Sequence, residues 1–254
     1  MPIWLIPAFL GTALLYASVG FGGGSTYNAL LALAGVDYRV LPAIALTCNI
    51  IVVIGGTGRC HRAGLLPWRR ALPLVLVSAP FAGLGGLTPI TETAFLALLA
   101  TSLFVAGLAL LVQRERPLET APAQQDRKTG FADLLTGAGV GYLAGLVGIG
   151  GGIFLTPYLH MTRWAAAKHI AATASLFILI NSITGLAGQL GKLGSTGALP
   201  EVAGYWPLAL AVLIGGQIGS IAGIRLLSPT LVRRATGLLI LYVAAQLAWR
   251  LLTR

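Results

Sequence analysis

Long apolar runs follow one another along the whole chain, separated by short polar or glycine-rich breaks. Runs of about 17–25 apolar residues match the thickness of the hydrocarbon core of a bilayer, so they predict membrane-spanning helices. No interval between them is long enough for a separate soluble domain. The runs and their breakers predict helical elements at residues 3–20, 25–35, 40–57, 72–88, 92–112, 131–147, 153–161, 168–190, 205–224 and 229–250.

Composition agrees with a protein that is surrounded by lipid rather than by water. Hydrophobic residues make up 56% of the 254 residues and charged residues only 9%, whereas soluble domains have roughly 25% charged residues. The formal charge of +10 comes from Lys and Arg side chains that are scattered over short loops, without the interleaved aromatic residues of a nucleic-acid interface. We therefore expect a lipid bilayer, and no nucleic acid, as a partner of this chain.

The second half of the chain repeats the pattern of the first half. When the chain is shifted on itself by 128 residues, about half its length, VGFGGG (Val19 to Gly24) superimposes on VGIGGG (Val147 to Gly152). Ten identities then occur without a gap over positions 11–50. Self-similarity at a fixed offset predicts a duplicated structural unit. The expected organisation is a first transmembrane repeat over 1–112, a cytoplasmic linker over 113–130 and a second transmembrane repeat over 131–254.

Each glycine triplet can be interpreted as the tip of a helical hairpin or as a break within one long span. As hairpin tips, the triplets place 13 of the 17 Lys and Arg residues on one side of the membrane; as simple breaks, they divide these residues 11 to 6. Cytoplasmic loops retain positive charge, so the hairpin interpretation fits better. A continuous helix over 3–35 would also be about 50 Å long, against a hydrocarbon core of about 30 Å.

A hairpin in each half gives five helical elements per repeat. An odd number of elements places the two repeats in opposite orientations, with both termini on the periplasmic side. The sequence therefore predicts an all-α polytopic membrane protein with two inverted-topology repeats, each of which contains a glycine-broken helical hairpin. This architecture is typical of secondary transporters.

The triplets Gly22–Gly24 and Gly150–Gly152 are expected to interrupt the helix, because each glycine costs roughly 1 kcal/mol relative to alanine in a helix interior. The short arms that follow, 25–35 and 153–161, reach about halfway across the bilayer, so their N-termini would face each other near its centre. Two such positive helix ends suit an anion. The alternative is that the triplets only allow close helix packing. We assign that packing role to Gly83, Gly85, Gly86, Gly215, Gly216, Gly219 and Gly223.

Polar residues within the predicted spans are neutral. All seven acidic residues lie in loops or at segment ends, which leaves no carboxylate for a cation pathway or a proton relay. Amide and hydroxyl side chains can bind an oxyanion by hydrogen bonds without burying a second charge. Thr47 and Ser175 align across the repeat, and interhelical hydrogen bonding is the alternative role for the other polar side chains. The predicted binding residues are Gly22, Gly23, Gly24, Asn28, Thr47, Asn49, Gly150, Gly151, Gly152, Thr173 and Ser175.

The paired glycine segments, the TASL stretch from Thr173 to Leu176 and the basic loop from Arg62 to Leu74 together resemble the TauE/SafE sulfite exporter family. The resemblance covers most of the chain. It implies movement of a small anion, such as sulfite or an organic sulfonate, across the bacterial inner membrane. It would place the triplets at two central turns and Thr173 and Ser175 on the adjoining helix, although Ala45 stands in the first half where the second has Thr173.

We therefore expect a secondary transporter, and not an enzyme, that binds a small anion between the glycine turns and exposes it to each side alternately. A passive channel for anions or neutral solutes, with the same turns as its filter, is the alternative. No nucleophile, acid and base converge in the sequence, and Cys48 and Cys60 lack the spacing of a metal site, so no cofactor or metal is expected. The sequence leaves open the anion, the direction, the coupling ion and the choice between a monomer and a homodimer.

Overall fold

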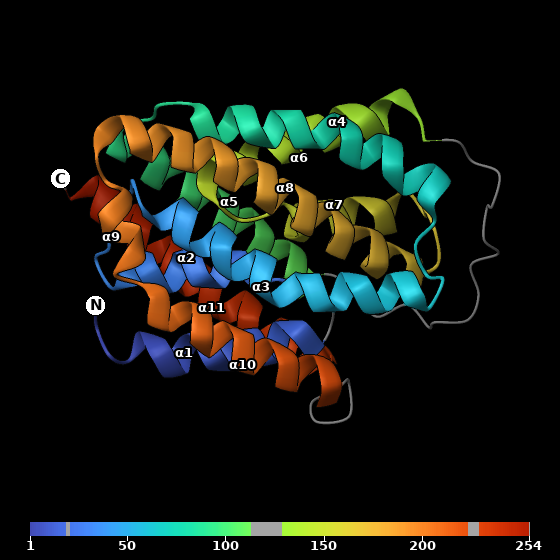
Figure 1. Cartoon of the computed structure of the whole chain (residues 1–254), viewed down its shortest axis with the longest axis horizontal. Coiled ribbons are helices and arrows are strands. Elements are labelled where there is room, and N and C mark those ends of the chain that lie inside the picture. Colours follow the sequence, from blue (N-terminus) through green and yellow to red (C-terminus); the bar gives the residue numbers. More distant parts are fainter. Residues whose placement is uncertain (19–20, 113–128, 223–228, 254) are drawn as a thin grey trace.

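The computed structural model of this chain describes residues 1–18, 21–112, 129–222 and 229–253, and these residues form helices without strands. Most of the predicted linker 113–130 lies outside the described residues, as do Val19, Gly20 and residues 223–228, with Gly223 among them. Most helices run along the long axis of the molecule (Figure 1). They are α1 (Leu5–Ser18), α2 (Gly24–Leu33), α3 (Leu41–Arg62), α4 (Trp68–Leu87), α5 (Glu92–Val112), α6 (Phe131–Val147), α7 (Gly152–Met161), α8 (Ala167–Thr196), α9 (Leu199–Ala203), α10 (Trp206–Ala222) and α11 (Pro229–Leu252).

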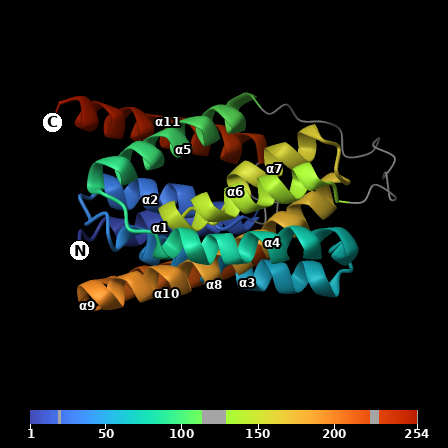
Figure 2. The same ribbon diagram turned by 90° about the horizontal axis from the view of Figure 1, so that it is seen from above.

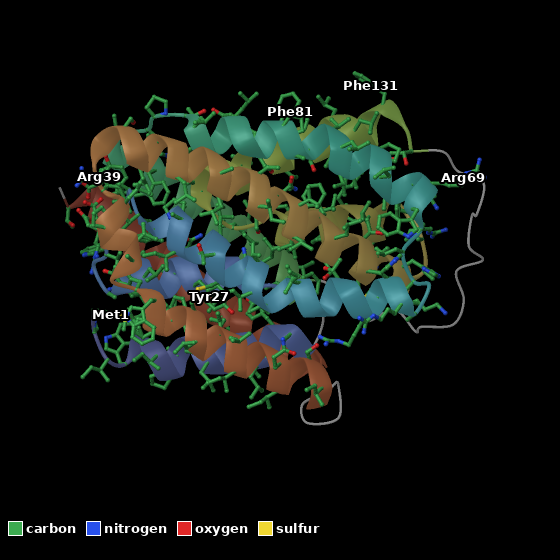
Figure 3. All side chains as sticks on the ribbon, in the orientation of Figure 1. Met1, Tyr27, Arg39, Arg69, Phe81 and Phe131 are labelled. Atoms are coloured by element: carbon green, nitrogen blue, oxygen red, sulfur yellow. The ribbon has the colours of Figure 1, made fainter. Side chains whose placement is uncertain are left out.

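The helices have the length and apolarity of membrane spans. In the described part of the chain, α3, α4, α5 and α8 are each long and apolar enough to cross a bilayer, and shorter apolar stretches lie in α1, α6, α10 and α11. Large hydrophobic side chains such as Phe81 and Phe131 are exposed on the outside of the molecule (Figure 3). An exterior of this kind fits lipid rather than water, and the chain is a multi-pass membrane protein.

The predicted elements all correspond to helices, but three helices extend well beyond their predicted bounds and one helix was not predicted. Helix α4 begins at Trp68 rather than at residue 72. The prediction for 40–57 stopped where the apolar run ends, whereas α3 continues to Arg62 because it packs against α8, where Thr57 and Ser175 share a hydrogen bond of 2.8 Å. Helix α8 likewise runs to Thr196, beyond the predicted residue 190, and stops at Gly197, which has a left-handed φ of 73°. The short helix α9 was not predicted, since five residues are too few to show a period.

Each glycine triplet lies between an apolar helix and a ten-residue helix, and the chain reverses there. Met1 and Arg39, which flank the α1–α2 pair, lie at the same end of the molecule, opposite Arg69 (Figure 3). In the second pair, Tyr158 near the end of α7 donates a hydrogen bond of 2.7 Å to Asp133 in the first turn of α6. Both pairs are therefore helical hairpins.

The two hairpins open toward different ends. The loop that follows α7 contains Trp164, whose ring stacks under the Arg70 guanidinium at 4.3 Å from its centroid. Thr129, which precedes α6, donates a hydrogen bond of 3.1 Å to the Arg70 carbonyl. The second hairpin therefore opens at the Arg69–Arg70 end, whereas the first opens at the end with Met1 and Arg39 (Figure 3).

The halves of the chain are interlocked. Helix α1 packs along α10 and α4 along α6, while α3 crosses α8 and α5 pairs with α11. Figure 2 shows the α5–α11 pair along one side of the molecule. The four longer helices of the first half, α1, α3, α4 and α5, therefore each pack most extensively against a helix of the second half. Either half alone would expose surface that is buried in the complete chain.

Glycines allow these helices to approach backbone to backbone. A Cβ on Gly141 of α6 would stand 2.5 Å from the Ser78 carbonyl oxygen of α4, and one on Gly145 would overlap the Ala82 carbonyl. A Cβ on Gly219 of α10 would overlap the carbonyl of Leu14 in α1 in the same way. The packing role predicted for Gly85, Gly86, Gly215 and Gly219 is confirmed by such overlaps.

The C-terminal end of α6 lies inside the protein, where its last carbonyls need partners other than water. The buried side chain of Gln189 on α8 donates from Nε2 to the carbonyl oxygens of Gly145 at 2.8 Å and Leu146 at 3.2 Å. An amide from a different span therefore caps this helix end.

Replacing Gly145 by alanine should destabilise the protein, because the added methyl group meets the α4 backbone, which cannot rotate away. We expect a loss of about 1–3 kcal/mol in thermal unfolding of the detergent-purified chain. Gly139 on the same helix is the matched control, since a Cβ there meets nothing within 4 Å. Equal unfolding midpoints for Gly145→Ala and Gly139→Ala would contradict the packing.

Replacing Gln189 by methionine, which has a similar shape, should leave two buried carbonyls without donors. The expected cost is about 1–3 kcal/mol in the same thermal unfolding assay. The control is Gln217→Met on α10, whose amide is half-buried and should matter less. If both variants unfold at the same temperature, the amide cap contributes nothing.

Candidate functional site

Both short helices begin at a glycine in the left-handed region, which other residues rarely adopt. Gly23 (φ 86°) is the N-cap of α2 and Gly151 (φ 81°) is the N-cap of α7. Because glycine has no side chain, neither cap supplies an acceptor to the first N–H groups of its helix. The donors and the positive dipole end at each helix start are therefore left for another group.

The side chain of Asn49, from the middle of α3, lies between the two glycine triplets. A Cβ on Gly22 would stand 2.5 Å from its Oδ1, and one on Gly150 would stand 2.7 Å from its Nδ2. A Cβ on Gly24 would overlap the same amide and stand 2.6 Å from the Ile149 carbonyl oxygen. The two turns thus pack against one amide group, and a larger residue at any of these three glycines would displace it.

Two asparagines of the first half hold the turn of the second half. Asn28 donates from Nδ2 to the Val147 carbonyl at 3.1 Å, and Asn49 donates from Nδ2 to the Ile149 carbonyl at 3.3 Å. Both asparagines are completely buried. Together with Gln189, they provide the backbone around the second turn with side-chain donors.

The turn of the first half is held differently. Tyr16 of α1 and Thr26 of α2 share a hydrogen bond of 2.8 Å between their hydroxyl groups. The Tyr27 ring stacks on Phe9 with 4.7 Å between the ring centroids, and it also lies 3.1 Å from the position of a Cβ on Gly23. At the first turn, hydroxyl groups and aromatic rings therefore have the role that side-chain amides have at the second turn.

Several buried oxygens around the two turns have no hydrogen-bond partner among the described residues. One is Ser182 Oγ of α8, which lies 3.2 Å from the position of a Cβ on Gly150. The others of this group are Asn28 Oδ1, Asn49 Oδ1, Thr156 Oγ1 and Tyr27 Oη. Buried polar atoms normally have partners, so this group marks a place where a further molecule would complete the hydrogen bonding.

The structure brings together only part of the predicted binding set. The six triplet glycines lie with Asn49 and Asn28 at the turns. The hydroxyls of Thr47 and Thr173 each donate to the carbonyl four residues earlier in their own helix, at 2.8 Å. Ser175 is paired with Thr57 between α8 and α3. Ligand binding by Thr47, Thr173 and Ser175 stays a prediction.

Sequence reasoning did not identify three of the unpartnered residues, Tyr27, Thr156 and Ser182. Thr156 aligns with Asn28 when the two glycine triplets are superimposed, so the predicted repeat could have indicated it. Ser182 has no such signal, because its first-half counterpart is Ile54. Only the packing of α8 against the second turn reveals it.

Charged side chains lie away from the turns. A cavity of about 570 Å³ opens near the chain termini, between the α2–α3 loop, α5 and α11, and its lining includes Asp37, Arg39, Glu92 and Arg250. Hydrogen bonds from Arg39, the shortest at 2.6 Å, hold the pKa of the Asp37 carboxyl below its ordinary value.

Asp133 caps α6 by accepting a hydrogen bond of 2.9 Å from the Gly130 N–H. Within the described part of the chain, no group of three His, Cys, Asp or Glu side chains could hold a metal ion.

Two known proteins similar to this chain are named as probable membrane transporter proteins. A probable membrane transporter protein of Sinorhizobium fredii is 32% identical over 247 residues, which are 97% of this chain and 98% of that protein. A probable membrane transporter protein of Methanocaldococcus jannaschii is 26% identical over 199 residues, which are 75% of this chain and 72% of that protein. No solved structure matches the chain significantly.

The family model described as sulfite exporter TauE/SafE matches residues 5–247. This match covers nearly the whole chain and confirms the resemblance carried by its paired glycine motifs. The chain belongs to the TauE/SafE sulfite exporter family.

Proposed function

We propose that this protein is a secondary transporter that carries a small anion, such as sulfite or a sulfonate, through a site between its two glycine turns. The family description names sulfite export, and the similar proteins are named as membrane transporters. The observation that carries the proposal is the meeting of two helix starts at one buried amide, Asn49, in the interior of the protein. Helix N-termini attract anions through their N–H groups and dipoles.

We propose further that the two halves are inverted-topology repeats that expose the site alternately. In support, the hairpins α1–α2 and α6–α7 open toward opposite ends, and α1 packs on α10 as α6 packs on α4. The central α3–α8 and outer α5–α11 contacts each join an element to its counterpart. A repeat of this kind can exchange the conformations of its halves and so open the site to the other side.

Transport would require movement of the turns in each cycle. In the present conformation, the amide of Asn49 fills the space between Gly22 and Gly150, and Ile178 presses against the second triplet, with its Cγ2 atom 3.1 Å from the position of a Cβ on Gly150. A shift of one hairpin relative to the other would make room for an anion beside this amide. A continuously open pore fits these close contacts less well than a carrier does.

The charges favour one orientation in the membrane. The end opposite the chain termini has Arg59, Arg62, Arg69, Arg70, Arg163 and Lys168. The other end has Arg39, Lys192 and Arg250 together with the acidic residues Asp37, Glu92 and Glu201. Because positively charged loops remain cytoplasmic, we place the first end in the cytoplasm, both termini in the periplasm and the chain in the bacterial inner membrane.

Proteoliposomes loaded with unlabelled sulfite should take up radiolabelled sulfite transiently above its equilibrium level, because a carrier exchanges its substrate across the membrane. Asn49→Asp should reduce this exchange at least about tenfold, since a carboxylate between the turns repels the anion. If the aspartate variant does not fold, Asn49→Leu serves as the test. Leucine has a similar volume and no hydrogen-bond donor, so this variant should also lose exchange.

Thr184→Val on α8 is the control for these variants, because the Thr184 hydroxyl donates to its own helix and its loss should leave exchange unchanged. Uptake without the transient excess would indicate a pore. Exchange at the wild-type rate by both Asn49 variants would remove the site from between the turns.

Membrane-impermeant maleimide should label Ile3→Cys and Arg39→Cys from outside intact cells, and Arg69→Cys only after permeabilisation. The background for these variants is Cys48→Ala with Cys60→Ser. The hairpin makes residues 3 and 39 emerge together, and the positive charges hold residue 69 in the cytoplasm. Labelling of residues 3 and 69 from the same side would contradict the orientation and the hairpin together.

A further inference from the structure

None of the described side chains that lie closest to the triplet glycines carries a charge, which leaves the backbone as the nearest source of positive potential. These side chains belong to Thr12, Tyr27, Asn49, Val53, Val140, Ala144, Phe177, Ile178 and Ser182. The two helix starts contribute roughly half an elementary positive charge each, so together they balance about one negative charge. A second negative charge would lie buried without a counter-charge, which is costly.

The orientation of two site amides is fixed by their partners. Asn28 and Asn49 each use Nδ2 to donate to a backbone carbonyl, and a carbonyl can only accept. Their Oδ1 atoms are therefore the free ends of the amides, and both are buried without a partner among the described residues. Oδ1 of Asn49 faces the first triplet, at 2.5 Å from the position of a Cβ on Gly22. The site thus offers acceptors beside the donors of the helix starts.

An anion that only accepts hydrogen bonds would leave these acceptors unsatisfied. Leaving a buried acceptor without a donor costs about 1–3 kcal/mol. This cost lowers the affinity of the interior site for anions that only accept hydrogen bonds. The hydroxyl of Ser182 can donate to the anion or accept from it, so it adapts to either ligand. The two asparagine oxygens cannot adapt in this way while their Nδ2 groups hold Val147 and Ile149.

We infer that the central site selects singly charged oxyanions that carry a hydrogen-bond donor of their own, such as a protonated sulfite or a hydroxyalkanesulfonate, over doubly charged anions. This inference rests on the proposed function, because it assigns the charge and donor content of the ligand to the same site. The anionic oxygens of the ligand face the N–H groups that begin α2 and α7. Its hydroxyl group donates to the amide oxygen of Asn49.

Thermal stabilisation of the purified full chain tests the inference with matched ligands. Isethionate and ethanesulfonate are both singly charged and differ by one hydroxyl group, so the expected dissociation constant of isethionate is lower by about threefold to tenfold. Sulfate has a similar anionic head with a second charge, and it should bind at least about tenfold more weakly than ethanesulfonate. Stabilisation at known ligand concentration gives each dissociation constant.

Sulfite supplies an internal test because it loses its proton near neutral pH. Its apparent dissociation constant should rise by about tenfold per pH unit above that ionisation, since only the protonated form binds. Ethanesulfonate, which does not ionise in this range, should bind equally well throughout. In Asn49→Leu, the preference for isethionate over ethanesulfonate should disappear; if that variant does not fold, the wild-type comparisons decide alone.

The failures of the two proposals can be told apart. If no anion stabilises the chain, the proposed anion transport fails. If anions bind but sulfate matches ethanesulfonate, or isethionate binds no better than ethanesulfonate, the charge and donor selection is overturned while transport stands. The charge and donor selection would also be overturned if anions without a hydrogen-bond donor bound only in the presence of sodium. In that case a cation would satisfy the asparagine oxygens.

Discussion

The need to satisfy backbone polar groups in a lipid-embedded interior governs this structure. A helix that stops inside the protein leaves carbonyls at one end and N–H groups at the start of the next helix, and no bulk water is available to either. The carbonyls at the end of α6 and in the turn after it accept hydrogen bonds from side-chain amides of α2, α3 and α8. The N–H groups at the starts of α2 and α7 have only glycine caps. The asymmetry leaves donors at the centre, which supports the proposal that an anion binds there.

Two of these amides join the halves of the chain. Asn28 and Asn49 belong to the first half, yet their acceptors lie at the second turn. When the two glycine triplets are superimposed, Asn28 and Asn49 align with Thr156 and Phe177. Phe177 packs on Gly151, with a ring carbon 2.9 Å from the position of a Cβ there. The turn of the second half is therefore held by hydrogen bonds from the first half. The turn of the first half is held by aromatic rings and hydroxyl groups. The two sides of the site are not chemically equivalent.

The helices and the hairpins could be predicted from the sequence because they depend on patterns along the chain. Apolar runs of bilayer length, the half-length repeat and the glycine triplets indicated the helices and the hairpins. Packing at Gly145 also follows a rule that small residues obey in membranes. The amide at Asn49 could be proposed as polar and interior, but not as the group between both turns, because that depends on how α3 crosses α8. Ser182 was missed for the same reason.

Anomalous diffraction from crystals of the full chain grown with selenite tests the central claim most directly, because selenium marks the position of an oxyanion without relying on its shape in a map. The account predicts an anomalous peak between Gly22–Gly24 and Gly150–Gly152, within hydrogen-bond distance of the Asn49 side chain. A peak confined to the outer cavity at Arg39 and Arg250, under conditions in which selenite competes with sulfite for exchange, would contradict it.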